Sequence, residues 1–153
     1  MMDPRGLGPV PVGGGWIIDE SLFRVLLDFE IQKARRLRYS VSIVCLTLER
    51  SSAENGERSP ASIAERIASH LRGTDAIAPS SEGLLFLLLI DAETAHLLAI
   101  LERLTTRFEA PMWSAGGASY PRTAIRAEDL LRQALDLLAR ARSEGGNRLY
   151  VAS

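Results

Sequence analysis

The sequence is poor in the residues that build covalent or metal-based sites. Its 153 residues include one Cys and two His, so an internal disulfide is excluded and little material exists for a cluster of soft metal ligands. The lone Cys45 lies within an apolar segment, VSIVCLTL, which is typical of a small core residue. These features favour a reducing compartment, and we expect a cytoplasmic protein.

Long hydrophobic runs and an excess of charge of either sign are also missing. The longest apolar run, residues 84–90, is far shorter than the ~20 residues that a membrane-spanning helix needs. A formal net charge of -1 provides no global field that would attract nucleic acid or an anionic membrane. The sequence therefore predicts neither membrane insertion nor a nucleic-acid partner.

What is present fits one globular domain behind a short leader. Hydrophobic residues make up 46% of the chain and charged residues 24%, close to an average soluble protein. Residues 1–15 are rich in Gly and Pro and show no periodicity, so we expect a flexible leader. Residues 16–153 form the predicted domain.

Hydrophobic periodicity alternates between helices and strands along this domain. Asp19 is a candidate N-cap for a helix whose apolar face comprises Leu22, Phe23, Leu26, Leu27, Ile31, Ala34 and Leu37. Further helices are predicted to begin at Pro60, Ala92 and Ala127, and residues 49–59 to form a loop. Strands are predicted at 41–48, 76–78, 84–89, 111–120 and 149–151. This order indicates an α/β (α+β) fold with a mostly antiparallel five-stranded sheet flanked by helices.

The C-terminal third carries a series of short motifs in a fixed order. They are Ser114-Ala115-Gly116-Gly117-Ala118, Tyr120-Pro121, Glu128-Asp129-Leu130-Leu131 and Gly145-Gly146-Asn147-Arg148. Upstream, residues 19–40 contain an ARR sequence, and Arg72-Gly73-Thr74-Asp75 precedes the predicted hairpin. In order and spacing, residues 17–152 resemble a GGDEF (diguanylate cyclase) domain, and the resemblance implies the nucleotide-cyclase-like fold of that family.

The positions that perform the family's chemistry are altered. Active members condense two GTP molecules into cyclic di-GMP and hold Mg²⁺ with acidic residues on the first strand and in the hairpin turn, because the metal must neutralise the triphosphate. The resemblance places Thr47 at the first-strand position, and only Glu49 is acidic two residues later. The segment that reads guanine in active members has no counterpart in residues 49–59.

The signature pentapeptide itself is replaced. It aligns with Ser81, Glu82, Gly83, Leu84 and Leu85, so that Gly83 and Leu84 stand where the family has its acidic pair. An apolar Leu84 binds no metal. The resemblance therefore implies a degenerate GGDEF domain with no catalytic residues, no bound metal and no cofactor, and thus not an enzyme.

A second family site has its residue types in place. Many members bind cyclic di-GMP at an inhibitory Arg-x-x-Asp motif five residues before the signature, and Arg72 and Asp75 occupy that spacing, with Arg103 at the matching position on the next helix. A guanidinium can bond the edge of guanine or a phosphate, and a carboxylate can accept guanine N–H groups. Structural roles fit equally, because Arg is favoured at a helix C-terminus and Asp in a turn, and Arg103 could be an exposed ion-pairing residue.

Three functions follow in order of preference. The first is a non-catalytic regulator that contacts an unknown protein partner in a bacterial signalling pathway, with or without sensing cyclic di-GMP through Arg72, Asp75 and Arg103. The second is a nucleotide-independent scaffold that forms a homodimer through its helices. The third is a residual diguanylate cyclase or GTP-binding remnant.

Overall fold

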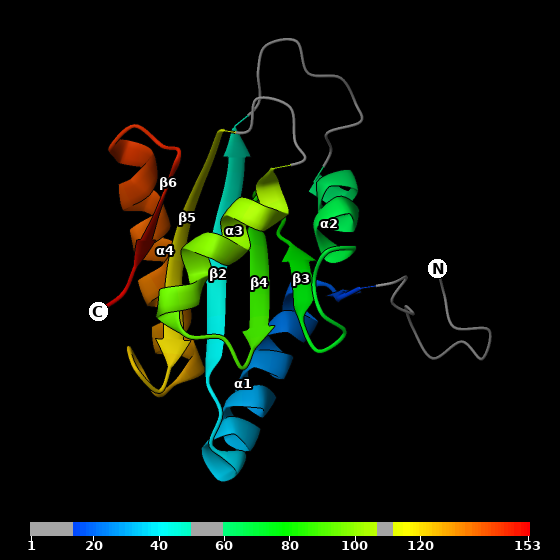
Figure 1. Cartoon of the computed structure of the whole chain (residues 1–153), viewed down its shortest axis with the longest axis vertical. Helices are drawn as coiled ribbons and strands as arrows, with labels where there is room; N and C mark the ends of the chain where they lie inside the picture. The colour runs from blue at the N-terminus through cyan, green and yellow to red at the C-terminus, as the bar shows by residue number, and fades with distance from the viewer. Residues whose placement is uncertain (1–13, 50–59, 107–111) are drawn as a thin grey trace, which may run out of the picture.

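A computed structural model describes residues 14–49, 60–106 and 112–153 (Figure 1). Residues 1–13 of the predicted leader and residues 50–59 of the predicted loop lie outside this description. The elements, in chain order, are β1 (Trp16–Ile17), α1 (Glu20–Leu37), β2 (Val41–Glu49), α2 (Pro60–Ala68), β3 (Ala76–Pro79), β4 (Leu85–Ile90), the 3-10 turn η2 (Thr94–His96), α3 (Leu97–Thr105), β5 (Met112–Tyr120), α4 (Ala127–Ser143) and β6 (Arg148–Val151).

The predicted mixed α+β fold is confirmed, with one strand more than expected. The six strands lie in the order β1-β3-β4-β2-β5-β6. The central strand β2 pairs antiparallel with β4 and β5, whereas the outer pairs β1–β3 and β5–β6 are parallel. The five-strand prediction missed β1 because Trp16 and Ile17 are too few to show an alternating pattern, and their pairing with Ala76 and Ile77 is long-range.

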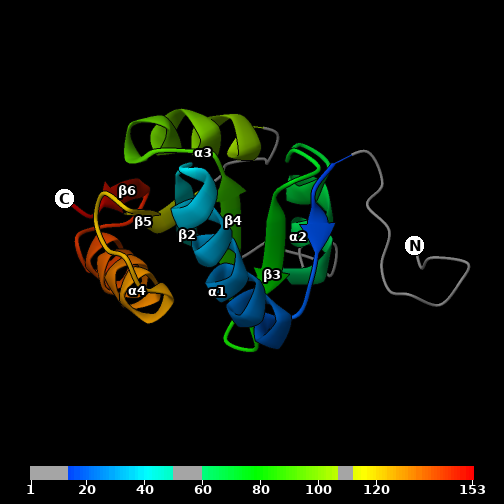
Figure 2. The same ribbon diagram turned by 90° about the horizontal axis from the view of Figure 1, so that it is seen from below.

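Two helical layers sandwich this sheet. The helices α1 and α4 pack on one face and α2 and α3 on the other, and Figure 2 shows α3 and α4 on opposite sides of the sheet. Along β2 the side chains alternate, with Ile43 and Cys45 directed to the first layer and Val44 and Leu46 to the second. This burial on both faces explains why β2 is a continuous apolar run.

The helix α1 begins as its sequence predicts but buries a narrower face. The Asp19 side chain accepts a hydrogen bond from the Leu22 backbone N–H at 2.7 Å, which confirms the N-cap. Its fully packed residues are Phe23, Leu27, Ile31 and Ala34. The assignment of Leu22 and Leu37 to the buried face is wrong, since their exposed fractions are 43% and 66%. Adjacent residues differ by ~100° around a helix, so Leu22 cannot share the direction of Phe23.

The helix predicted from residue 92 is divided in two. The turn η2 comes first, closed by Glu93 and His96, whose side chains each accept a bond from the other's backbone, and α3 follows. No helix among the described residues is long and apolar enough to cross a membrane.

Candidate functional site

The β3–β4 turn, which contains the residues that the resemblance aligns with the family signature, is held together by its own residues. The Ser80 hydroxyl accepts the backbone N–H groups of Glu82 and Leu84 at 3.2 and 3.0 Å, and the Ser80 N–H donates to the Leu84 carbonyl at 2.8 Å. Gly83 has a φ of 82°, a left-handed conformation that disfavours other residues. The turn therefore closes without a bound ligand.

Within this turn the predicted residues differ in exposure. Ser81, Glu82 and Gly83 are exposed, Leu84 is half-buried against the core beneath α1 and α4, and Leu85 is buried as the first residue of β4. Strand β4 thus starts one residue later than predicted. Glu82 is the only carboxylate of the turn, and it is exposed, whereas the apolar Leu84 packs against the core.

The resemblance assigns Thr47 and Leu84 to metal-binding positions. Thr47 lies near the end of β2, and Leu84 directly precedes β4. Thr47 is largely buried and pairs with Ser114 of β5. The β2–β4 register ends with Leu46 paired to Leu85, so Thr47 and Leu84 are each the next residue beyond this last pair. At the positions that the resemblance assigns to metal ligands, a neutral hydroxyl and an isobutyl group are a poor fit for Mg²⁺, which prefers carboxylate oxygens.

Acidic side chains elsewhere in residues 14–49, 60–106 and 112–153 do not gather into a metal site either. Those residues contain no group of three or more His, Cys, Asp or Glu side chains that could hold a metal ion. The side chain of Glu49, at the end of β2, lies outside the description.

Arg72 and Asp75 are brought together, but mainly with each other and with β4. The Asp75 carboxylate is 4% exposed. One oxygen accepts the Ile90 backbone N–H at 2.9 Å, and the other accepts the backbone N–H of Arg72 at 3.2 Å and its Nε–H at 3.4 Å. The Arg72 guanidinium also donates to the Ile90 carbonyl. The pair therefore clamps the loop after α2 to the end of β4.

Trp16 also binds this loop through hydrogen bonds, a role that the sequence did not predict. Its indole N–H donates to the Gly73 carbonyl at 3.1 Å, and its backbone N–H donates to the Asp75 carbonyl at 3.0 Å. A cavity of about 360 Å³ lies beside it, lined by Leu22, Leu26 and Asp75 among others. An aromatic residue three positions before the N-cap Asp19 was the only local signal.

Arg103 is not linked to this pair. It is an exposed residue of α3, and no hydrogen bond or ion pair between described residues joins it to Arg72 or Asp75. Two of the three residues predicted for a nucleotide site are therefore in contact, and the third stands apart from their hydrogen-bond network.

Comparison with known proteins identifies this architecture. No protein-family model and no curated protein matches the sequence. The GGDEF domain of YfiN (TpbB) from Pseudomonas aeruginosa is similar in structure with a TM-score of 0.78 at 19% identity, covering 90% of this chain and 91% of that one. This chain is a GGDEF-like domain by fold.

Two other structural neighbours were solved with a bound molecule. SiaD, a diguanylate cyclase from P. aeruginosa in complex with its activator SiaC, has a TM-score of 0.73 at 17% identity, over 88% of this chain and 58% of that one. DgcB from Caulobacter crescentus, in complex with cyclic di-GMP, has a TM-score of 0.71 at 15% identity, over 89% and 82%. At these identities the similarity establishes the fold of the GGDEF-like domain.

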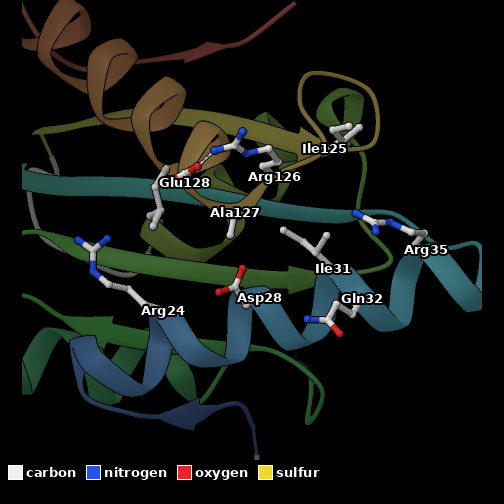
Figure 3. Close-up of a pocket in the computed structure, with 10 residues that line it drawn as sticks. Arg24, Asp28, Ile31, Gln32, Arg35, Ile125, Arg126, Ala127 and Glu128 are labelled. Carbon is white, nitrogen blue, oxygen red and sulfur yellow. Dashed lines mark ion pairs between the residues drawn. The ribbon is translucent and has the colours of Figure 1, made fainter.

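The GGDEF-like domain also contains a larger cavity between α1 and α4, of about 680 Å³ (Figure 3). Its charges are mixed, since the wall includes acidic as well as basic side chains and Arg126 is ion-paired with Glu128. Ile31 and Leu131 supply apolar surface. No local pattern predicts this cavity, because residues 24–35 of one wall and residues 125–131 of the other are at least 90 residues apart along the chain.

Cys45 is the one thiol of the GGDEF-like domain, and its environment keeps it unreactive. The side chain is fully buried in β2, and burial raises its pKa to about 12. The thiolate, which is the nucleophile, is therefore scarce at neutral pH. The prediction of a core cysteine is confirmed.

Proposed function

We propose that this GGDEF-like domain is a non-catalytic regulator that acts by contact with a protein partner in a bacterial signalling pathway. The residue types at Thr47 and Leu84, each next to the last β2–β4 pair of Leu46 with Leu85, carry the proposal. Phosphoryl transfer depends on metal ions that neutralise the triphosphate and position the attacking hydroxyl. Leu84 has no oxygen to offer, and the neutral hydroxyl of Thr47 brings none of the negative charge that carboxylate ligands would bring to such ions.

A nucleotide assay tests the loss of catalysis. We expect no cyclic di-GMP after incubation with GTP and Mg²⁺, and no change in melting temperature when both are added, since a ligand that binds only the folded state raises it. An active diguanylate cyclase under the same conditions is the control. Product formation, or a Mg²⁺-dependent rise in melting temperature, would refute the proposal and favour a residual cyclase or GTP-binding remnant.

Binding of cyclic di-GMP is a second candidate function, favoured by the exposure of one side chain. The Arg72 side chain is 56% exposed and lies in the loop that walls the cavity beside Trp16. Its guanidinium has donors to spare for a guanine edge or a phosphate. The Asp75 carboxylate, by contrast, would have to give up backbone hydrogen bonds to accept from guanine.

Calorimetry with cyclic di-GMP tests this candidate. A receptor should give saturable heat that is lost in Arg72→Ala and weakened in Arg103→Ala, whereas Arg122→Ala, which removes an exposed arginine elsewhere, should bind as the unmodified chain does. Absence of heat at high micromolar ligand, or equal affinity in Arg72→Ala, would exclude sensing through this loop.

The remaining alternative is a scaffold that never responds to nucleotide. It is separated from the receptor by the same titration, because it predicts no heat with any guanine nucleotide. In each case we propose that residues 16–153 act as one domain in the cytoplasm and that residues 1–15 form a leader to it.

A further inference from the structure

The outward face of α1 is apolar, although no other described element covers it. Leu22, Val25 and Phe29 have exposed fractions of 43%, 63% and 56%. Their spacing of i, i+3 and i+7 places them along one side of the helix, away from the buried side that contains Phe23 and Leu27. We call these three residues the outer α1 stripe. Large apolar side chains gathered in this way mark an interaction surface.

Neighbouring residues extend the outer α1 stripe at both ends. Leu22 shares the cavity beside Asp75 with the half-buried Leu26 and with Trp16, whose exposed fraction is 37%. At the other end, the Lys33 ammonium lies 5.3 Å from the centre of the Phe29 ring. In Figure 1 the C-terminal end of α1 projects past the sheet.

We propose that the outer α1 stripe is a dimer interface in which α1 of one copy packs antiparallel against α1 of a second copy. Positions 22 and 29 are equally distant from a midpoint next to Val25. A two-fold axis through that point sets Leu22 of each copy against Phe29 of the other and brings the two Val25 side chains together. The same patch then serves both copies, as a two-fold dimer requires.

The charges along α1 select the antiparallel arrangement. Glu20 and Lys33 are ion-paired within the helix with Arg24 and Glu30. The N-cap Asp19 remains as the acidic group at the start of α1, and Arg35 and Arg36 remain as the cations of its last turn. Parallel packing would bring the cationic ends together, whereas antiparallel packing brings the cationic end of each copy to the acidic end of the other. The helix dipoles also oppose each other favourably in that orientation.

This surface is separate from the proposed loss of catalysis, because it involves neither Thr47 nor Leu84 nor Arg72. It extends the proposed function by naming one contact, and it holds whether or not the GGDEF-like domain makes cyclic di-GMP. The nucleotide assay and the association assay can therefore fail independently.

Sedimentation velocity over a concentration series into the high micromolar range tests the dimer. The unmodified chain should show a sedimentation coefficient that rises with concentration. Val25→Glu sets two carboxylates against each other at the axis and should raise the dissociation constant about 100-fold. The matched control is Leu98→Glu, which alters a residue 50% exposed on α3 in the opposite layer and should dimerise normally. A chain that stays monomeric, or a Val25→Glu variant that associates as well as the control, would overturn the proposal.

Cysteine cross-linking tests the orientation. Leu22→Cys and Phe29→Cys variants, mixed and mildly oxidised, should form a disulfide-linked heterodimer more readily than either variant forms a homodimer. The buried Cys45 does not interfere. Stronger cross-linking of Leu22→Cys with itself than of the mixture would indicate parallel helices and overturn the arrangement. Circular dichroism melts establish that each variant is folded.

Discussion

Replacement of Asp75 by Ala distinguishes a structural clamp from a ligand-binding carboxylate. In the folded chain this side chain accepts the backbone N–H groups of Ile90 and Arg72, at 2.9 and 3.2 Å, and is 4% exposed. Ala keeps the backbone but removes both acceptors. The Ile90 N–H, at the end of β4, then has no acceptor in this loop, which is the costly outcome for a buried donor.

The expected loss of stability follows from these two bonds. A hydrogen bond to a charged group contributes ~1.5–3 kcal/mol net, and the side-chain bond from Arg72 adds little because that side chain is 56% exposed. With water replacing part of the loss, Asp75→Ala should lower the free energy of unfolding by ~3 kcal/mol. In a domain of this size ~1 kcal/mol corresponds to ~2–4 °C, so the melting temperature should fall by ~6–12 °C. Asp75→Asn keeps one carbonyl acceptor and should lose about half as much.

Urea unfolding and thermal melts measure this difference against a matched control. Asp91→Asn removes the charge of an exposed carboxylate nearby, at a φ of 57° that Asn tolerates, and should change the free energy of unfolding by less than ~0.5 kcal/mol. If Asp75→Ala melts within a degree of Asp91→Asn, the clamp has no structural importance, and the case for Asp75 as a nucleotide ligand becomes stronger.

Three further predictions concern the turn, the thiol and the pH dependence of stability. Gly83→Ala should destabilise by ~1–2 kcal/mol in thermal melts because of its φ of 82°, whereas Gly73→Ala, whose added Cβ meets nothing within 4 Å, should be neutral or stabilising. Cys45 should resist a thiol reagent in native buffer and react at the rate at which the chain unfolds; fast labelling would contradict its burial. Burial and the hydrogen bond to Glu30 raise the pKa of Tyr39 to about 12 from 10.0, so its contribution to stability is complete below pH 10 and is lost as the pH rises through 12. Tyr39→Phe should therefore flatten the melting temperature over that range, and an unchanged alkaline slope would contradict the assignment.

Local signals in the sequence were sufficient for most of the fold. The continuous apolar run of β2 predicted a buried strand, and Asp19 predicted the start of α1, because capping and burial depend on neighbouring residues. Strand β1 could not be predicted in this way. Its two residues are defined by pairing with Ala76 and Ile77, some 60 residues later.

Periodicity also failed to separate the two apolar sides of α1. Apolar residues on adjacent stripes give one broad hydrophobic face in the sequence, and only packing shows that Phe23 is buried while Leu22 and Leu37 are exposed. The outer α1 stripe was hidden for that reason. Val25 and Phe29 are apolar residues outside the predicted face, and they were the only sign of the outer α1 stripe in the sequence.

The site residues show the same division between local and long-range causes. The family spacing placed Arg72 and Asp75 in one predicted site, and their contact follows from a local cause, since residues three apart in a turn are close. Nothing in the tetrapeptide shows that Ile90, fifteen residues later, also binds the carboxylate. The residue types of a motif show which chemical groups are present. They do not show which of those groups already form hydrogen bonds within the folded chain.

The retained and the altered motifs therefore have to be judged by different physical criteria. The Asp75 carboxylate accepts backbone N–H groups of the loop after α2 and of β4. This structural role explains the presence of Asp75 without any nucleotide. Thr47 and Leu84 stand at strand ends where the fold makes no demand for a charge, and a carboxylate there would be useful only to a bound cation. Under the proposed function, the absence of carboxylates at Thr47 and Leu84 bears directly on catalysis, whereas the Arg72–Asp75 pair bears on ligand binding only through the exposed guanidinium. A binding experiment on this domain should accordingly vary Arg72 and leave Asp75 in place.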